Sequence, residues 1–443
     1  MNATPGLIVA APASGSGKTV LTLGLLRALR DRGLAIAGAK AGPDYIDPAF
    51  HTAATDRPAF NLDPWAMRPE TLAGLIAAQP ADLLLVEGVM GLFDGAHLPD
   101  RPDAGSTADL AALTGWPVIL VVDAGKQAAS AAAIVRGFAG HRHDVRIAGV
   151  IFNRVASESH EAVLRSAVTS ATPEIPVLGA VYRDPALALP ERHLGLVQAG
   201  EHGDLERFIA AAAEAVTAQI DLDTLRGLAV PYQGIGGTET PPPLPPIGQV
   251  IAVARDAAFA FAYPAILAAW QQAGAEIRTF SPLADDAPDP AADAIYLPGG
   301  YPELHAGQLA GADVFLGGLR AAAARSTKIF GECGGYMVLG RGLIDETGAR
   351  HEMADLLPVE TSFAARRLHL GYRTATVAQD GPLGPAGTTY RGHEFHYAAI
   401  AGEDTRTPLF TAENARGEPL GQTGAIAGSV CGSFIHLIDR AAA

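Results

Sequence analysis

A Gly-Lys-Thr loop between two hydrophobic patterns constrains the fold of this chain more than any other feature of its sequence. The stretch PASGSGKT occupies residues 12–19, directly after the apolar run at 6–11. Beyond it, leucines recur at four-residue spacing from Leu21 to Leu29, as on the apolar face of an amphipathic helix, and Gly33 is a typical helix stop. A strand, a glycine-rich turn and a helix in this order predict a phosphate-binding loop in an α/β domain.

The loop departs at one position from the usual pattern GxxxxGK[ST], because Pro12 stands where the first glycine is expected. We expect Lys18 to reach the β- and γ-phosphates of a nucleotide, and Thr19 to bind magnesium. A Gly/Ser turn with a solvated lysine is the alternative, and the flanking strand and helix patterns argue against it. The residues expected to bind the nucleotide in this loop are Ser14, Gly15, Ser16, Gly17, Lys18 and Thr19.

Short apolar runs alternate with helical patterns on both sides of a proline-rich segment. Runs that end in Gly, Asp or Asn are typical of parallel strands buried on both faces, so the pattern predicts an α/β fold. Five prolines fall within the six positions 241–246, where neither a helix nor a central strand can continue. We therefore predict two open, mostly parallel-sheet domains at residues 1–228 and 248–443, joined by a Gly/Pro-rich linker at 229–247.

Composition excludes several classes of function. The net charge is −15 and no block of Lys or Arg occurs, which argues against a general nucleic-acid binder. No apolar stretch approaches the roughly 20 residues that span a bilayer, so no membrane partner is expected. The first residues carry no basic leader, and a cytoplasmic location is expected. The chain has only two cysteines, too few for a disulfide scaffold.

Charged residues follow two of the apolar runs in the first half. In open α/β sheets, ligands bind outside the carboxyl ends of the strands, so these residues are expected to converge with the loop. Lys40 is expected to contact the nucleotide, and Asp94 the substrate. For each carboxylate, a cap or turn role is the alternative. The expected magnesium ligands are Thr19, Asp44, Asp47 and Glu87.

Two further segments of the first half carry candidate ligands. Asn153 ends the apolar run at 147–153, where its amide is suited to pairing with a nucleobase edge, although an asparagine in a turn is equally ordinary. The segment LPERHLGL brings Glu191, Arg192 and His193 together. We expect this cluster to meet a polycarboxylate substrate, with a helix cap as the alternative.

The second half contains a cysteine in a pattern typical of a nucleophile elbow. In GECGG, Cys333 stands between glycines, after an apolar strand and before a helical pattern; the glycines relieve crowding, and the helix N-terminus favours a thiolate. Attack on a carboxamide also needs an oxyanion donor and a base, for which the Gly300 N–H and His436 are the candidates. Cys431 has no elbow around it and is expected to be a small buried hydrophobe.

These motifs, in their order along the chain, resemble the cobyrinic acid a,c-diamide synthase family over nearly the whole length. The resemblance implies a dethiobiotin-synthetase-like ATP domain followed by a class I glutamine amidotransferase domain of the cobyric/cobyrinic type. It makes Cys333 the glutaminase nucleophile and His436 the residue that raises its nucleophilicity. Most class I amidotransferases place a glutamate two residues after the histidine, where this chain has Ile438, so Glu394 and His396 are hypotheses for the third member. The stretches that carry the resemblance are PASGSGKT, AGPDYIDPAFH, EGVMGLFDG, LPERHLGL, LPGGYPELHA, ECGG and RGHEFHY.

The resemblance also implies a reaction. ATP with Mg²⁺ phosphorylates a carboxylate, and ammonia released from glutamine displaces the phosphate, after passage between the domains. The implied substrates are the a and c side chains of a corrinoid polycarboxylate in cobalamin biosynthesis, on hydrogenobyrinate or cobyrinate. A nickel sirohydrochlorin of coenzyme F430 formation is a same-class alternative, and a regulatory P-loop ATPase with a degenerate amidotransferase module is another. The sequence leaves a homodimer open.

Overall fold

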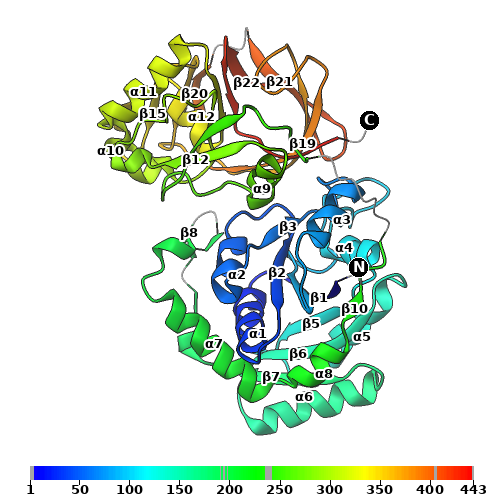
Figure 1. Cartoon of the computed structure of the whole chain (residues 1–443). Helices are drawn as coiled ribbons and strands as arrows, with labels where there is room; N and C mark the ends of the chain where they lie inside the picture. The colour runs from blue at the N-terminus through cyan, green and yellow to red at the C-terminus, as the bar shows by residue number, and fades with distance from the viewer. Residues whose placement is uncertain are drawn as a thin grey trace. The chain divides into compact units, whose positions relative to one another are not determined.

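The computed structural model describes residues 4–189, 191–192, 195–196, 198–234, 242–403 and 407–441 (Figure 1). The chain divides into two compact units, Met1–Trp65 with Pro69–Thr240, and Ala66–Arg68 with Pro241–Ala443. Each unit contains parallel strands that alternate with helices along the chain. The predicted fold class, two α/β domains in one chain, is confirmed. No helix within the described ranges is long and apolar enough to cross a membrane.

The sheet of the first unit places the glycine-rich loop at its centre. Strand β1 (Pro5–Ala10) lies between β4 (Leu83–Glu87) and β5 (Val118–Asp123), and all three run parallel. The strand order is β3-β2-β4-β1-β5-β6-β7, with β10 antiparallel to β1. Since β1 and β4 end side by side, the loop after β1 meets the charged residues that follow the neighbouring strands. The other elements of this unit are β2 (Ile36–Ala41), β3 (Phe60–Leu62), β6 (Ile147–Val155), β7 (Val177–Tyr182), β8 (Glu191–Arg192), β9 (Gly195–Leu196), β10 (Val230–Pro231), α1 (Lys18–Asp31), α2 (Asp47–Thr55), α3 (Pro69–Ala77), α4 (Thr107–Thr114), α5 (Ala131–His141), α6 (Glu158–Ala171), α7 (Leu205–Gln219) and α8 (Leu222–Gly227).

The main sheet of the second unit is parallel in one half and antiparallel in the other. Its order is β12-β11-β13-β14-β23-β22-β21-β18-β19-β24, and the pairs from β12 to β23 are parallel. A smaller sheet has the order β16-β15-β17-β20. The elements are β11 (Val250–Ala254), β12 (Glu276–Phe280), β13 (Ala294–Leu297), β14 (Lys328–Glu332), β15 (Gly342–Ile344), β16 (Arg350–Glu352), β17 (Val359–Ser362), β18 (His369–Val377), β19 (Thr389–His396), β20 (Ala399–Glu403), β21 (Pro408–Asn414), β22 (Pro419–Ala427), β23 (Val430–Ser433), β24 (His436–Arg440), α9 (Pro264–Gln272), α10 (Ala306–Ala310), α11 (Asp313–Ala324) and α12 (Gly334–Leu339).

The antiparallel half of this sheet curls back on itself. Strands β23 and β24 stand at its two ends in the pairing order, yet only Phe434 and Ile435 separate them along the chain. Consecutive Cα atoms are about 3.8 Å apart, so two residues cannot span a flat sheet of this width. The two ends of the antiparallel half therefore meet. Strand β24 begins at His436, close to the end of β23, and β23 is the strand that pairs with β14.

Two helical glycines allow a test of packing in the first unit. Gly24 lies in α1 where this helix contacts α7, and a Cβ added there would stand 2.6 Å from the backbone oxygen of Ala212. Gly137 lies in α5, and apart from the adjacent backbone of its own helix no described heavy atom lies within 4 Å of its added Cβ. We expect Gly24→Ala to lower the free energy of unfolding by about 1–3 kcal/mol, because the overlap outweighs the helix propensity of alanine.

The matched variant Gly137→Ala is expected to raise the free energy of unfolding by about 0.5–1 kcal/mol, because only helix propensity changes there. Thermal and urea unfolding of both variants and the parent measure this difference. Equal effects of the two substitutions would contradict the close contact between α1 and α7.

Candidate functional site

The turn from β1 into α1 has the backbone of a phosphate-binding loop. Gly15 and Gly17 have φ values of +74° and +86°, in the left-handed region that favours glycine. At Gly17 space is also limiting, because an added Cβ would lie 2.2 Å from the side-chain Nδ2 of Asn153. The helix begins at Lys18, so its first backbone N–H groups face the loop. This geometry suits an anion at the start of α1.

The amide of Asn153 is engaged with the loop. Its Nδ2 donates a hydrogen bond to the backbone oxygen of Ser16 at 2.9 Å, and its Oδ1 accepts one from the N–H of Arg154. In this structure the amide therefore holds the phosphate-binding loop to the end of β6. The nucleobase contact suggested by the sequence stays a prediction.

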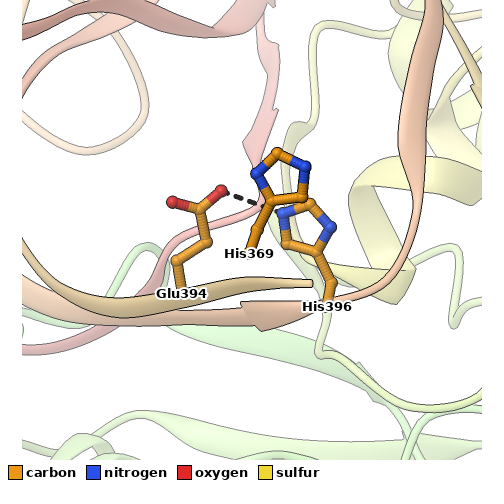
Figure 2. A group of neighbouring side chains, drawn as sticks. All are labelled: His369, Glu394 and His396. Carbon is orange, nitrogen blue, oxygen red and sulfur yellow. Dashed lines mark hydrogen bonds and ion pairs between the residues drawn. The ribbon is translucent and has the colours of Figure 1, made fainter. Parts of the chain in front are cut away.

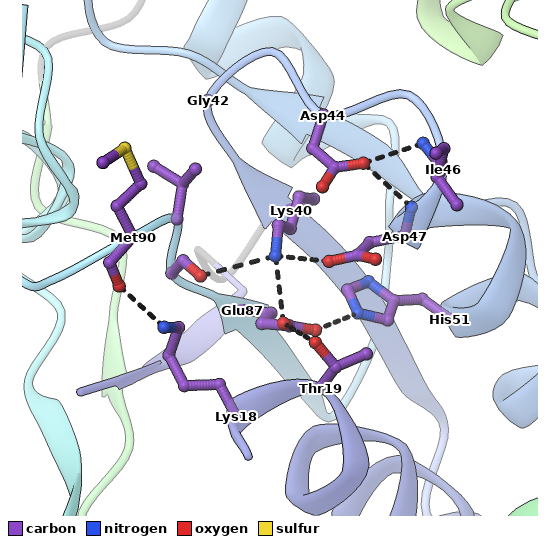
Figure 3. Close-up of polar contacts among 12 residues, drawn as sticks. Lys18, Thr19, Lys40, Gly42, Asp44, Ile46, Asp47, His51, Glu87 and Met90 are labelled. Carbon is purple, nitrogen blue, oxygen red and sulfur yellow. Dashed lines mark hydrogen bonds and ion pairs between the residues drawn. The ribbon is translucent and has the colours of Figure 1, made fainter. Parts of the chain in front are cut away.

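A buried ion cluster lies behind the loop (Figure 3). The Nζ of Lys40 pairs with Asp47 at 2.5 Å and with Glu87 at 2.9 Å. The hydroxyl of Thr19 donates to the same Glu87 oxygen at 2.6 Å, and Lys18 donates to the backbone oxygen of Met90. Lys40 and Glu87 are register partners on β2 and β4. The structure thus brings Lys18, Thr19, Lys40, Asp47 and Glu87 together, as the convergence of strand ends predicts.

Asp44 and Asp94 have turn roles as well as proximity to this cluster. Asp44 accepts hydrogen bonds from the N–H groups of Ile46 and Asp47, which fixes the start of α2 (Figure 3). Asp94 accepts one from the N–H of Gly91 at 2.9 Å. These are the bonds expected of turn carboxylates. Each carboxylate keeps further lone pairs for a ligand.

Burial and mutual charge shift the pKa values in the cluster. Burial, with the nearby Asp44 carboxylate, raises the pKa of Asp47 to about 8. Burial also acts to raise the pKa of Glu87, but Lys40, His51 and Thr19 hold it well below its usual range. Burial, with the neighbouring Lys40, lowers the pKa of Lys18 to about 8. Glu87 is therefore the carboxylate most firmly held as an anion.

His51 belongs to this cluster and was missed by the sequence reasoning. It is buried, and its Nε2 shares a hydrogen bond of 2.8 Å with Glu87 (Figure 3). The sequence spacing could have indicated this role, because His51 follows Asp47 by four residues and both face the same side of α2. A histidine in this place orients the Glu87 carboxylate.

The segment with Glu191, Arg192 and His193 is described only in part. Glu191 and Arg192 form β8, which pairs with the backbone of β9. His193 lies outside the described residues. The expected contact of these residues with a substrate stays a prediction.

The turn from β14 into α12 has the strained backbone of a nucleophile elbow. Cys333 precedes the helix with φ 47° and ψ −104°, a rare conformation for a residue other than glycine. Gly335 admits no side chain, because an added Cβ would lie 2.0 Å from the backbone oxygen of Leu297. The glycines around Cys333 therefore make this turn sterically feasible.

Cys333 and His436 lie against the same glycine. A Cβ added to Gly299 would stand 2.4 Å from Cε1 of His436 and 3.3 Å from Cβ of Cys333. A Cβ on Gly334 would lie 3.1 Å from the backbone N of Gly300. The structure thus brings Cys333 and His436 together at Gly299, and it places the Gly300 N–H beside Gly334, the residue after Cys333. Gly299 also belongs to this site and was not predicted from the sequence. The pair of glycines in LPGGYP was the sequence feature that could have indicated it.

Burial shifts the pKa values of Cys333 and His436 in the directions that favour the neutral form of each. Burial raises the pKa of the Cys333 thiol above its ordinary value of 9.0, although the N–H of Gly334 acts in the opposite direction. Burial, with the charges of His393 and His396, lowers the pKa of His436 to about 3. The backbone N–H of Gly334, at the start of α12, favours the thiolate, but burial outweighs it, so the thiolate expected from the sequence is not favoured here. A neutral imidazole is the form that can accept the thiol proton.

Glu394 and His396, the two candidates for the third member, interact with each other (Figure 2). Glu394 accepts a hydrogen bond from Arg373 at 2.6 Å and shares one with His396 at 2.9 Å. The ring of His396 stacks on His369 with an interplanar angle of 6° and on Phe434 with an angle of 15°. Glu394, His396 and His369 offer atoms within 4.8 Å of one another, as metal ligands do. Parallel rings direct their nitrogen lone pairs in parallel planes, however, so a shared ion would require one ring to turn.

Comparisons with known proteins match both units. A family model described as a CobQ/CobB/MinD/ParA nucleotide binding domain matches residues 7–197, and one described as a CobB/CobQ-like glutamine amidotransferase domain matches residues 250–442. Three similar relatives, each 55% identical to this chain, are named hydrogenobyrinate a,c-diamide synthase. They come from Sinorhizobium sp, Rhizobium meliloti (strain 1021) and Brucella abortus biovar 1 (strain 9-941). The alignments cover 99%, 98% and 98% of this chain and 99%, 99% and 98% of the relatives.

The protonation state of Cys333 predicts how the ligand-free protein reacts with iodoacetamide. Only the thiolate reacts, and a pKa above 9.0 keeps its fraction small at neutral pH. We expect the rate constant for alkylation of Cys333 to rise through pH 9 with no plateau. Mass spectrometry of the Cys333 peptide measures it, with Cys333→Ser as the control for reaction at Cys431. A plateau reached below pH 7.5 would contradict the buried neutral thiol.

Proposed function

The chain belongs to the cobyrinic acid a,c-diamide synthase family of glutamine-dependent carbon–nitrogen ligases, and we propose that it amidates the a and c side chains of hydrogenobyrinate in cobalamin biosynthesis. The observation that carries this substrate is the identity of 55% over 99% of the chain with a relative of that name. The two sites support it, because the reaction needs one site to activate a carboxylate and another to release ammonia. We assign the synthetase reaction to residues 1–228 and the glutaminase reaction to 248–443, joined by the linker at 229–247.

We propose ATP as the nucleotide of the first unit, with its phosphates on the loop at residues 12–19. The oxygen donors suit Mg²⁺, because the hydroxyl of Thr19 and a carboxylate oxygen of Glu87 lie only 2.6 Å apart in a buried group of carboxylates. When bound, the ion offsets negative charge on the transferring phosphoryl group. Lys18 and Lys40 add positive charge near it. The proposed magnesium ligands are Thr19, Asp44, Asp47 and Glu87.

The reaction in the first unit makes a carboxylate reactive. A side-chain carboxylate oxygen of the substrate attacks the γ-phosphorus of ATP, giving an acyl phosphate and ADP. Ammonia then attacks the acyl carbon, and phosphate leaves as the amide forms. We propose that the substrate contacts Asp94, Glu191, Arg192 and His193. Of these, Arg192 and His193 are the residues suited to pairing with its other carboxylates.

The reaction in the second unit supplies the ammonia. Cys333 attacks the carboxamide of glutamine while His436 takes the thiol proton, and the N–H groups of Gly300 and Gly334 stabilise the oxyanion. His436 then gives the proton to the departing ammonia, and water hydrolyses the thioester to glutamate. We propose that ammonia passes within the protein to the acyl phosphate, because most ammonia in neutral water is protonated.

The test of this function is the mass of the product. The purified protein is incubated with glutamine, Mg-ATP and, separately, hydrogenobyrinate, cobyrinate and nickel sirohydrochlorin. Each conversion of a carboxylate to an amide lowers the product mass by about one unit while ATP is consumed. We expect a product about two units lighter from hydrogenobyrinate.

The two other substrates and an ATPase assay identify the alternatives. A diamide formed from cobyrinate or nickel sirohydrochlorin, with none from hydrogenobyrinate, would contradict the substrate. ATP turnover with no mass change in any of the three would contradict the ligase and favour the regulatory ATPase.

A further inference from the structure

A buried carboxyl group next to Cys333 has no role in the steps above. Glu332 is 1% exposed and ends β14, directly before the elbow. One of its oxygens, Oε2, accepts a hydrogen bond of 2.6 Å from the hydroxyl of Tyr296. The other, Oε1, accepts one of 2.8 Å from the backbone N–H of Leu437. Both oxygens are therefore occupied by donors from other strands.

The bond to Leu437 joins the two chain segments that carry Cys333 and His436. Glu332 immediately precedes the cysteine, and Leu437 immediately follows the histidine. Their strands are not neighbours in the sheet, because β14 pairs with β23 while β24 pairs with β19. The Glu332 side chain thus connects β14 to β24 at the place where the two ends of the antiparallel half meet. It fixes the start of β24 relative to the end of β14.

This chain lacks the glutamate that most class I amidotransferases carry two residues after the histidine. Two residues after His436 stands Ile438, which is 2% exposed and has no polar side-chain atom. We infer that Glu332 is a positioning residue of the glutaminase reaction: by holding the Leu437 N–H, it sets the place of the His436 imidazole beside Cys333. This inference rests on the proposed roles of Cys333 and His436.

Three substitutions of Glu332 separate positioning from the other roles of a carboxyl group. Glu332→Gln keeps an oxygen for the Leu437 N–H, and its amide N–H can donate to the oxygen of Tyr296. Glu332→Ala leaves both donors without their acceptor. Glu332→Asp keeps the charge but shortens the side chain by one methylene, so that it cannot keep both bonds at their present lengths. If Glu332 has a positioning role, the glutaminase kcat of Glu332→Gln should therefore exceed that of Glu332→Asp and Glu332→Ala.

The experiment measures glutamine hydrolysis per reactive Cys333 in the full-length protein, with hydrogenobyrinate and Mg-ATP present. Reactive sites are counted by covalent labelling with the glutamine analogue 6-diazo-5-oxonorleucine. We expect kcat per labelled site to fall about 10- to 100-fold in Glu332→Ala and Glu332→Asp, because small misplacements cost rates of this order. The KM for glutamine should stay within about threefold, and Glu332→Gln should keep the parent kcat within about threefold.

Two controls separate positioning from a general loss of structure. With ammonium as the nitrogen source, every variant should retain the amidation rate of the parent, because Cys333 is bypassed. Tyr390→Phe removes another buried hydroxyl of the same unit, which donates to the backbone oxygen of Leu383 at 2.6 Å, and should leave kcat per labelled site unchanged. A purely structural role would lower the number of labelled sites and leave their rate unaltered.

The inference is overturned if Glu332→Ala keeps the parent kcat per labelled site. Where Glu332→Ala fails to fold, Glu332→Asp decides by the same criterion. Cys333→Ser distinguishes this failure from that of the proposed function. Glutamine-dependent activity retained in Cys333→Ser would refute the nucleophile itself. Activity lost in Cys333→Ser but kept in Glu332→Ala would refute only the role of Glu332.

Discussion

Both candidate sites depend on a sharp turn from a buried parallel strand into a helix, and only small residues allow this turn. In the first unit, Gly15 and Gly17 adopt left-handed backbone angles, and Gly17 also leaves room for Asn153. In the second, Gly335 packs so closely on Leu297 that no side chain fits. Each turn points backbone N–H groups and one reactive side chain, Lys18 or Cys333, out of the carboxyl end of a sheet. The chemistry proposed for each unit begins from that placement.

The two sites use burial for opposite electrostatic purposes. Behind the loop, Lys40 is paired with Asp47 and Glu87, so a buried charge is balanced by hydrogen-bonded partners. A buried ion pair gives little net stability, so this arrangement is better explained by function than by folding. Around Cys333 and His436 burial instead raises the pKa of the thiol and lowers the pKa of the imidazole, which favours the neutral form of each. A neutral pair can move one proton between its members without taking up another from water.

Local sequence signals predicted the parts of the fold and sites that depend on neighbouring residues. The loop and the elbow were found because a strand, its glycines and a helix follow one another along the chain. Lys40, Asp47 and Glu87 were found because parallel strands end at the same edge of a sheet. His51 was missed although it lies four residues after Asp47, because a lone histidine carries little signal without knowledge of what faces it.

Other features depend on contacts between distant residues, and no local pattern encodes them. The curl of the antiparallel half brings β14 close to β24, and the bond between Glu332 and Leu437 joins residues 105 positions apart. The raised pKa of the Cys333 thiol has the same origin, since the adjacent Gly334 N–H favours the thiolate while the surrounding tertiary structure removes water. The pairing of Asn153 with the loop likewise joins residues 137 positions apart.

We propose that one chain releases ammonia at Cys333 and consumes it in the first unit. The most direct measurement supplies glutamine labelled with ¹⁵N in its amide, together with an excess of unlabelled ammonium, Mg-ATP and hydrogenobyrinate. Mass spectrometry then gives the ¹⁵N content of the new amides. Transfer within the protein predicts amides that carry almost only ¹⁵N. Amides with the isotope ratio of the surrounding solution would show that ammonia is released first, and would contradict transfer within the protein.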